Sequence, residues 1–200
     1  IGLGVLSKNQ TGAKTRGLHL HSTFVVSTEG LPLGLLQAQF SAPEPKSETD
    51  TRPQPSIPIE EKKTFAWIEG LRTCVELDKQ LPGTRQICVM DREADFFELF
   101  DEQRKTGKVD LLVRSKHDRV IDDKAGHLFE SVRDSPICGE MVIQVQRQSS
   151  RTKKSKQQAR PGHVQRSATV AVRYKEIELR PGVYQKNKAP IKLTVVHVQE

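Results

Sequence analysis

Residues 86–100 read QICVMDREADFFELF and carry the strongest fold signal in the chain. The first five of them, 86–90, are mostly apolar and have the length of a buried strand. Apolar residues then recur at helical spacing over 94–106, and a second buried strand is predicted over 109–113. A strand, a helix and a strand in this order predict a parallel pair of strands joined by a crossover helix.

Asp91 stands directly after the first of these strands, at the head of the charged run Asp-Arg-Glu-Ala-Asp. In open α/β sheets, binding sites lie beyond the carboxyl ends of the parallel strands. A carboxylate held there suits a divalent-metal ligand, because Mg²⁺ is usually bound through one or two protein carboxylates. For Glu93 and Asp95 a simpler explanation suffices, since acidic side chains near a helix N-terminus stabilise it by about 0.3–1 kcal/mol each. The same explanation is an alternative for Asp91.

The residues before this unit predict a hairpin and a helix. LHLHSTFVV at 18–26 and LGLLQAQF at 33–40 are two strand-like runs with a short connection, which favours an antiparallel hairpin. Residues 42–60 hold five of the eleven prolines and predict a mobile surface loop. Apolar residues at helical spacing predict a helix over 62–80, which the Pro-Gly pair at 82–83 ends.

After residue 115 the character of the chain changes. Strands are predicted at 140–147, 167–174 and 191–198, separated by polar, basic or Pro-Gly stretches. We therefore predict an α/β chain in two parts. Residues 1–115 form a ribonuclease H-like core, with a mixed sheet and helices, that lacks its first strand. Residues 116–200 form a β-rich insertion.

The net charge of +7 is distributed unevenly. Residues 1–115 hold 15 basic and 16 acidic residues, whereas residues 116–200 hold 17 basic and 9 acidic residues. No acidic residue interrupts the stretch 147–166, which contains seven Lys and Arg residues. This pattern favours a polyanion partner. The alternative is a solvated loop that happens to be basic.

Several protein classes are disfavoured. The three cysteines, Cys74, Cys88 and Cys138, form no CxxC pair, so we expect small buried thiols in a reducing cytoplasm rather than disulfides or a zinc site. No apolar run approaches the ~20 residues of a membrane-spanning helix, and we expect no membrane partner. The first residues have neither a signal-peptide pattern nor an initiator Met, so we expect the chain to be a piece of a longer protein.

Four segments together resemble a known family. VMDREADFFELF at 89–100, followed by LLVRSKHDR at 111–119, resembles the second-aspartate region of the DDE transposases of the insertion-sequence-four family. TRGLHLHSTFVVSTEGLPLGLL at 15–36 is similar to the second and third strands of that family. QQARPGHVQRSATVAVRYKEIELRPG at 157–182 is similar to its basic insertion hairpin. The resemblance implies a metal-dependent DNA transposase, dimeric on its transposon ends and located in the bacterial cytoplasm with the nucleoid.

The resemblance also implies roles for particular residues. Asp91 matches the second member of an Asp-Asp-Glu triad that binds two Mg²⁺ or Mn²⁺ ions. Residues expected to contact double-stranded DNA are Arg114, Lys116, His117 and Arg119 after the second strand, and Lys153, Lys154, Lys156, Arg160 and Arg166 on the basic hairpin. The hairpin stretch has no aromatic residue, so it suits phosphate contact better than base stacking.

The chain departs from the family pattern at the two other catalytic positions. Residues 1–17 contain no Asp or Glu to serve as the first carboxylate, and no Tyr-Arg-Glu-Lys signature precedes Glu200. We therefore predict a catalytic-core fragment that binds DNA without cleaving it, although the complete parent cleaves and transfers strands. Alternatives are a truncated transposase that only binds DNA, and a ribonuclease H-like nuclease unrelated to transposition. His19 and His21 share one face of a strand, as a metal-binding pair would. Because no third ligand is nearby in the sequence, they are expected to be ordinary hydrogen-bonded histidines.

Overall fold

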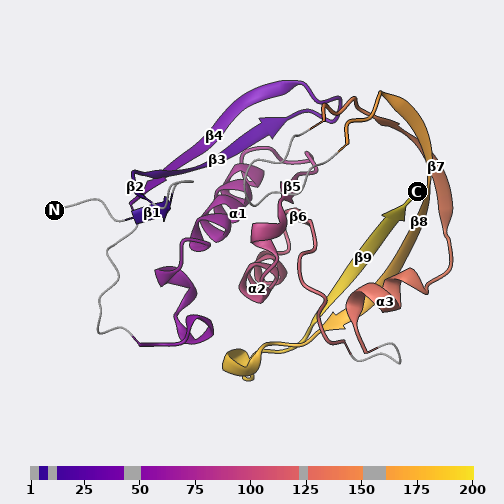
Figure 1. Ribbon diagram of the computed structural model, residues 1–200. Coiled ribbons are helices and arrows are strands. Elements are labelled where there is room, and N and C mark those ends of the chain that lie inside the picture. Colours follow the sequence, from indigo (N-terminus) through magenta and orange to yellow (C-terminus); the bar gives the residue numbers. More distant parts are fainter. Residues whose placement is uncertain (1–4, 9–12, 43–50, 122–125, 151–160) are drawn as a thin grey trace. The chain divides into compact units, whose positions relative to one another are not determined.

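The computed structural model describes residues 5–8, 13–42, 51–121, 126–150 and 161–200 (Figure 1). The chain is a mixed α/β protein whose contacts divide it into two units. The first unit comprises residues 1–117 and 181–188, and the second comprises residues 118–180 and 189–200. The short segment 181–188 therefore belongs with the first unit, although the sequence placed it in the insertion. Among the described residues, no helix is long and apolar enough to cross a membrane.

The first unit opens with two antiparallel strand pairs. Strand β1 (Val5–Lys8) pairs with β2 (Lys14–Arg16), and β3 (His19–Val26) pairs with β4 (Pro32–Ser41). The second pair confirms the predicted hairpin. Its turn is closed by a hydrogen bond from the Ser27 amide to the Leu31 carbonyl, and Gly30 takes the left-handed backbone conformation that the turn requires.

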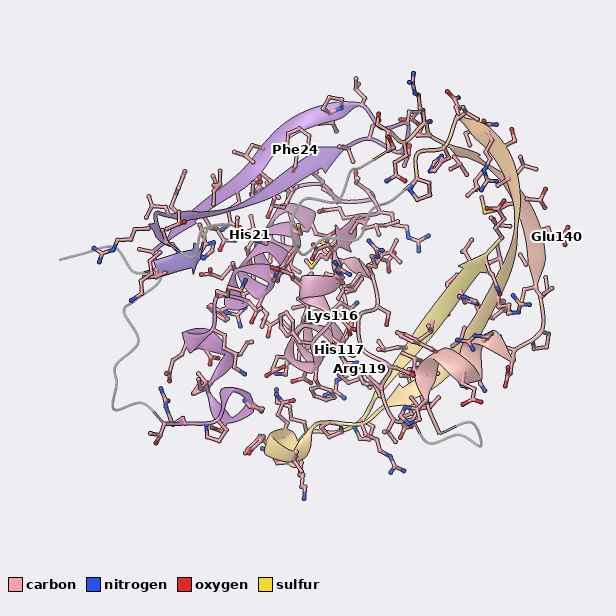
Figure 2. The ribbon with its side chains drawn as sticks, viewed as in Figure 1. His21, Phe24, Lys116, His117, Arg119 and Glu140 are labelled. Atoms are coloured by element: carbon pink, nitrogen blue, oxygen red, sulfur yellow. The ribbon has the colours of Figure 1, made fainter. Side chains whose placement is uncertain are left out.

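The alternation along β3 gives the hairpin two faces. His19, His21 and their alternate neighbours are half-buried, whereas Leu20, Phe24 and Val26 are exposed. Figure 2 labels one residue of each face, His21 and Phe24. Helix α1 (Phe65–Asp78) lies along the hairpin (Figure 1). Gly70 permits this close packing, because a Cβ atom at that position would lie 3.1 Å from the Thr23 hydroxyl oxygen.

The predicted crossover unit is confirmed. Strand β5 (Ile87–Met90) and strand β6 (Asp110–Val113) pair in parallel, and α2 (Phe97–Thr106) connects them after the short 3₁₀ turn η3 (Arg92–Ala94). Gly107 caps α2 in the left-handed conformation. Side chains from α1, β5, α2 and the connections around them form one core: Ile68, Leu71, Cys74, Cys88, Ala94, Leu99 and Val109.

The expectation of a single mixed sheet with residues 86–90 at its centre is not met. In the described residues, β3–β4 and β5–β6 are separate two-stranded sheets, and β5 bonds to a strand on one side only. One face of β5 packs into the core through Cys88, while Ile87 and Val89 on the other face are exposed. Both strand pairs therefore present an apolar face that no described element covers.

The Pro-rich segment was predicted to be a mobile loop over 42–60. Its residues 43–50 lie outside the described residues, and the rest contains two 3₁₀ turns, η1 (Gln54–Ser56) and η2 (Ile59–Glu61). Ile59 packs against the core, and Arg52 pairs with Glu61 at 2.7 Å. These contacts connect the described part to the first unit, and the predicted mobility of the segment stays a prediction.

The second unit is a three-stranded antiparallel sheet with one helix. Strands β7 (Gly139–Val145), β8 (Arg166–Leu179) and β9 (Ile191–Gln199) lie in that order and confirm the three predicted strands. Helix α3 (Leu128–Arg133), which the sequence did not predict, packs Leu128 and Val132 against Ile177. The remaining 3₁₀ turn, η4 (Val183–Gln185), lies in the segment that belongs to the first unit.

One cysteine departs from the expectation of three buried thiols. Cys74 and Cys88 are buried in the core of the first unit, but Cys138 is exposed just before β7. A hydrogen bond with the Cys74 thiol and burial raise the pKa of Cys88, so this thiol stays protonated.

Candidate functional site

The carboxyl ends of β5 and β6 lie side by side. Met90 pairs with Val113 at the last position of the parallel ladder, and the Arg114 amide continues the ladder by donating to the Met90 carbonyl at 3.1 Å. Asp91 and Arg114 therefore leave the sheet at the same edge. This edge is where open parallel sheets place their functional groups.

Asp91 has an exposed side chain and a defined local role. Its carboxylate oxygen Oδ1 accepts a hydrogen bond from the Glu93 amide at 2.7 Å, so Asp91 is the N-cap of η3. Asp91 therefore stabilises an N-terminus, as the alternative explanation expects, but this is the N-terminus of η3 and not that of α2. The other oxygen, Oδ2, has no hydrogen-bond partner among the described residues, which leaves it available to an incoming ligand.

The sequence analysis attributed Asp95 to stabilisation of a helix N-terminus, but the structure gives it a different role. It ends η3, and its side chain is buried, with 7% of the residue exposed. Its oxygen Oδ2 accepts hydrogen bonds from the Lys116 amide at 2.7 Å and the His117 amide at 3.0 Å. The carboxylate thus holds the segment that follows β6, and it does not cap α2, whose N-cap is Phe96.

Glu93, between these two aspartates, is more than half exposed and lies 3.9 Å from the Lys63 ammonium. Such an exposed pair contributes little to stability. Nothing in this geometry gives Glu93 a role beyond favouring the start of the turn.

The basic residues that leave β6 lie on an exposed segment. Figure 2 shows Lys116 and His117 on this segment, and both side chains are exposed, as is that of Arg114. None of these three side chains forms an ion pair with a described residue. Arg119 belongs to the second unit, where its carbonyl accepts the Leu128 amide. The division into units thus cuts the predicted DNA-contacting segment after His117.

The structure describes only part of the predicted basic hairpin. Lys153, Lys154, Lys156 and Arg160 lie outside the described residues. The two chain segments that flank them are joined at Gln148 and His163, whose amides and carbonyls bond reciprocally at 2.9 Å. Gly162 fits there because a Cβ atom would lie 2.7 Å from the Gln148 carbonyl oxygen.

Arg166, the last predicted DNA contact, already has a partner inside the chain. Its guanidinium forms a bidentate pair with the Glu200 carboxylate, with Nη2 2.7 Å from Oε2. The hydrogen bonds between them raise the pKa of Arg166 and lower that of Glu200. A phosphate would have to displace Glu200, so Arg166 is a weaker candidate than Lys116.

Sequence reasoning missed the environment of His21. Its ring packs edge-on against the Trp67 indole of α1, with 4.4 Å between ring centroids. Burial lowers the pKa of His21, and the charges of Asp91, Glu93 and Glu69 oppose this by raising it. His21 therefore lies within electrostatic reach of Asp91. The sequence around His21 does not distinguish it from His19, because its contact with Trp67 depends on how α1 packs against the hairpin.

The described residues do not supply a complete metal site. No cluster of three or more His, Cys, Asp or Glu side chains in them could hold an ion. Asp95, the nearest other aspartate of the charged run, already binds backbone amides. A two-ion site needs carboxylates from separate elements, and Asp91 alone does not provide them.

Neither protein-family models nor curated proteins gave a match to this chain.

Proposed function

We propose that this chain is part of the catalytic domain of a DDE transposase, whose parent protein cleaves DNA strands and joins them to new sites. One observation carries the proposal. Asp91 and the basic segment beginning at Arg114 leave the same edge of a parallel strand pair, where a carboxylate for metal and cations for phosphate are both needed.

The proposed ribonuclease H-like core accounts for two features of the first unit. In the described residues, β3 and β5 each have an unpaired edge, and one strand between them would join the two pairs into a single mixed sheet. The exposed apolar faces around Phe24 and Val89 are also expected for an incomplete core. Parallel sheets are usually covered on both faces.

Mg²⁺ or Mn²⁺ is the proposed cofactor of the parent, with Asp91 as one ligand. The other carboxylates of the triad have no counterpart in this sequence, and the described residues do not replace them. We therefore assign no catalytic step to this chain alone. Its share of the proposed reaction is to place one carboxylate and to bind DNA.

Double-stranded DNA, in the form of transposon ends, is the proposed partner, and the parent is proposed to act as a dimer. Arg114, Lys116 and His117 are exposed at the strand ends, and residues 116–200 carry all of the excess positive charge. Cations in this arrangement contact phosphates, which gives binding without sequence preference.

A second candidate is a non-catalytic protein that binds DNA without cutting it. The incomplete metal site favours this interpretation for the chain itself. A ribonuclease H-like nuclease unrelated to transposition is a third hypothesis.

The test uses the 200-residue chain with duplex DNA. We expect binding whose logarithmic salt dependence has a slope of about −0.9 for each phosphate contacted, and no cleavage with Mg²⁺ or Mn²⁺. Changing Lys153, Lys154 and Lys156 together to Ala should flatten the slope, whereas the same change at the exposed Lys79, Lys108 and Lys186 should not. Absence of DNA binding would refute the proposed function. Metal-dependent nicking that disappears in Asp91→Ala would refute the claim that the chain lacks a complete site.

A further inference from the structure

The side chain of Asp95 joins two parts of the first unit that are far apart in sequence. It lies between η3 and α2, and its neighbours Ala94 and Phe97 are buried in the core. Its carboxylate binds the Lys116 and His117 amides, 21 and 22 residues further along the chain. The carboxylate is therefore fixed by the core on one side and holds an exposed segment on the other.

This interaction begins where the sheet stops holding the chain. The parallel ladder gives its last hydrogen bond at the Arg114 amide, which donates to the Met90 carbonyl. Beyond that point, the amides of Lys116 and His117 donate to the same Asp95 oxygen. Hydrogen bonds to an ionised acceptor are shorter and about twice as strong as neutral ones, so the carboxylate replaces the ladder as the anchor.

The anchored residues are Lys116, whose ammonium extends the positive charge of this edge, and His117, whose ring can form a hydrogen bond with a phosphate. Their backbones are held from the buried side, whereas the Lys116 and His117 side chains are exposed. A backbone that is already held loses less conformational entropy when DNA binds, so binding costs less free energy than it would for a flexible segment. Asp91 and Asp95 flank the same short 3₁₀ turn. The Asp95 hydrogen bonds therefore also fix the position of this segment relative to the Asp91 carboxylate.

We propose that Asp95 is a positioning residue, which fixes Lys116 and His117 for phosphate contact beside Asp91. This inference rests on the proposed function, because it requires that the chain bind DNA. It assigns Asp95 no contact with DNA or metal. The competing explanation is that Asp95 only stabilises the fold.

The experiment compares Asp95→Asn with Asp101→Asn in the 200-residue chain. Asp101 is a matched control, since it is a buried carboxylate of the same unit whose partners are Arg104, Lys105 and Lys188. Two readouts are measured where both variants remain folded: amide hydrogen exchange at residues 116 and 117 without DNA, and the salt dependence of binding to duplex DNA.

We expect Asp95→Asn to speed exchange at both amides and to weaken DNA binding about tenfold. The salt slope should fall by about 0.9 for each phosphate that the variant no longer neutralises. Asp101→Asn should leave the exchange at these amides and the slope unchanged. Equal effects of the two variants on DNA binding, or an unchanged slope after the amides become unprotected, would overturn the proposal.

A second variant covers the case in which Asp95→Asn fails to fold. Lys116→Ala with His117→Ala leaves the Asp95 hydrogen bonds in place and should reduce the salt slope by itself. If this double variant binds DNA like the original chain, Asp95 has no phosphate-binding side chain to position and the proposal fails. If the original chain binds no DNA, the proposed function fails. The exchange data at residues 116 and 117 then still show whether Asp95 protects these amides, so the two failures can be told apart.

Discussion

The charged side chains at the two ends of the β5–β6 pair have different kinds of partner. At the amino end, Arg85 and Asp110 satisfy each other, with Nε 2.6 Å from Oδ2. At the carboxyl end, Asp91 and Asp95 bind backbone amides, and the Arg114 side chain forms no ion pair with a described residue. The Arg85 and Asp110 charges neutralise each other, whereas the Arg114 side chain and the Asp91 oxygen Oδ2 have no such partner among the described residues and are available to a ligand. The difference supports a site at the carboxyl end.

The largest effect should come from removing Asp91 in the complete parent protein that we propose, with Asp110 at the amino end of the strand pair as the control. We expect Asp91→Ala to reduce DNA cleavage below detection, because the proposed metal site loses a ligand. DNA binding should stay the same or tighten slightly, since the variant removes a negative charge. Asp110→Ala should leave cleavage unchanged. The measurement is strand cleavage of end-containing DNA beside an affinity assay.

Full activity of the parent with Asp91→Ala would reduce this residue to an N-cap of η3. Comparable losses of cleavage in both aspartate variants would show that the two ends do not differ in function, which would contradict the comparison itself.

The next largest effect concerns stability at a buried carboxylate. Asp101 lies in α2 with 2% of the residue exposed, and its partners are Arg104, Lys105 at 3.0 Å and Lys188 at 3.1 Å. Burial raises the pKa of Asp101, but hydrogen bonds from Lys105, Lys188 and Arg104 outweigh it, so the pKa lies below its ordinary value of 3.8. The ionised carboxylate therefore stabilises the fold.

We expect Asp101→Ala to lower the free energy of unfolding by about 3 kcal/mol, in the lower part of the range for breaking a buried pair. Asp110→Ala, at an exposed pair, should cost under about 1 kcal/mol. The Asp101 contribution is fully present above pH 3.8 and is lost as the pH falls through the lowered pKa. Denaturant unfolding at neutral pH and at about pH 3 measures both effects. A loss of stability no greater than that of Asp110→Ala would show that these ion pairs contribute little.

A smaller effect should distinguish the arginines at the two ends. Arg114→Ala should weaken DNA binding by the chain and reduce the salt slope by about 0.9, the value for one phosphate. Arg85→Ala removes the same charge from the amino end, where Asp110 already neutralises it, and should leave the slope unchanged. Salt titrations of duplex DNA binding measure both. Equal slopes for the two variants would mean that only overall charge matters.

The sequence predicted those elements whose signal is local. Alternation around Phe24 and the apolar run before Asp91 predicted the hairpin and the parallel unit, because burial on one face fixes a period of two or 3.6 residues. The three strands of the second unit were also predicted. Helix α3 was missed because six residues are too few to show helical periodicity.

Interactions between distant residues were beyond the sequence. Asp95 was attributed to the nearest helix terminus, although its partners are the amides of Lys116 and His117. Backbone amides carry no sequence signature, so no pattern could reveal this pairing. The separate strand pairs were also missed, because hydrophobic alternation shows that a strand exists and does not show which strands lie beside it.

The smallest predicted effect tests whether the carboxyl-end charge reaches β3. Burial holds the pKa of His21 below its ordinary value of 6.5, and the Asp91 charge partly opposes that shift. Asp91→Asn removes this attraction, so the pKa of His21 should fall further, whereas Asp110→Asn should not move it. In the original chain, neutral His21 is favoured by folding. Its contribution to stability is therefore present above pH 6.5 and is lost as the pH falls through the lowered pKa. An NMR titration of the His21 ring in the three proteins gives the answer. An identical His21 pKa in all three proteins would show that the Asp91 charge has no measurable effect on β3. The electrostatic influence of Asp91 would then be limited to the β5–β6 pair.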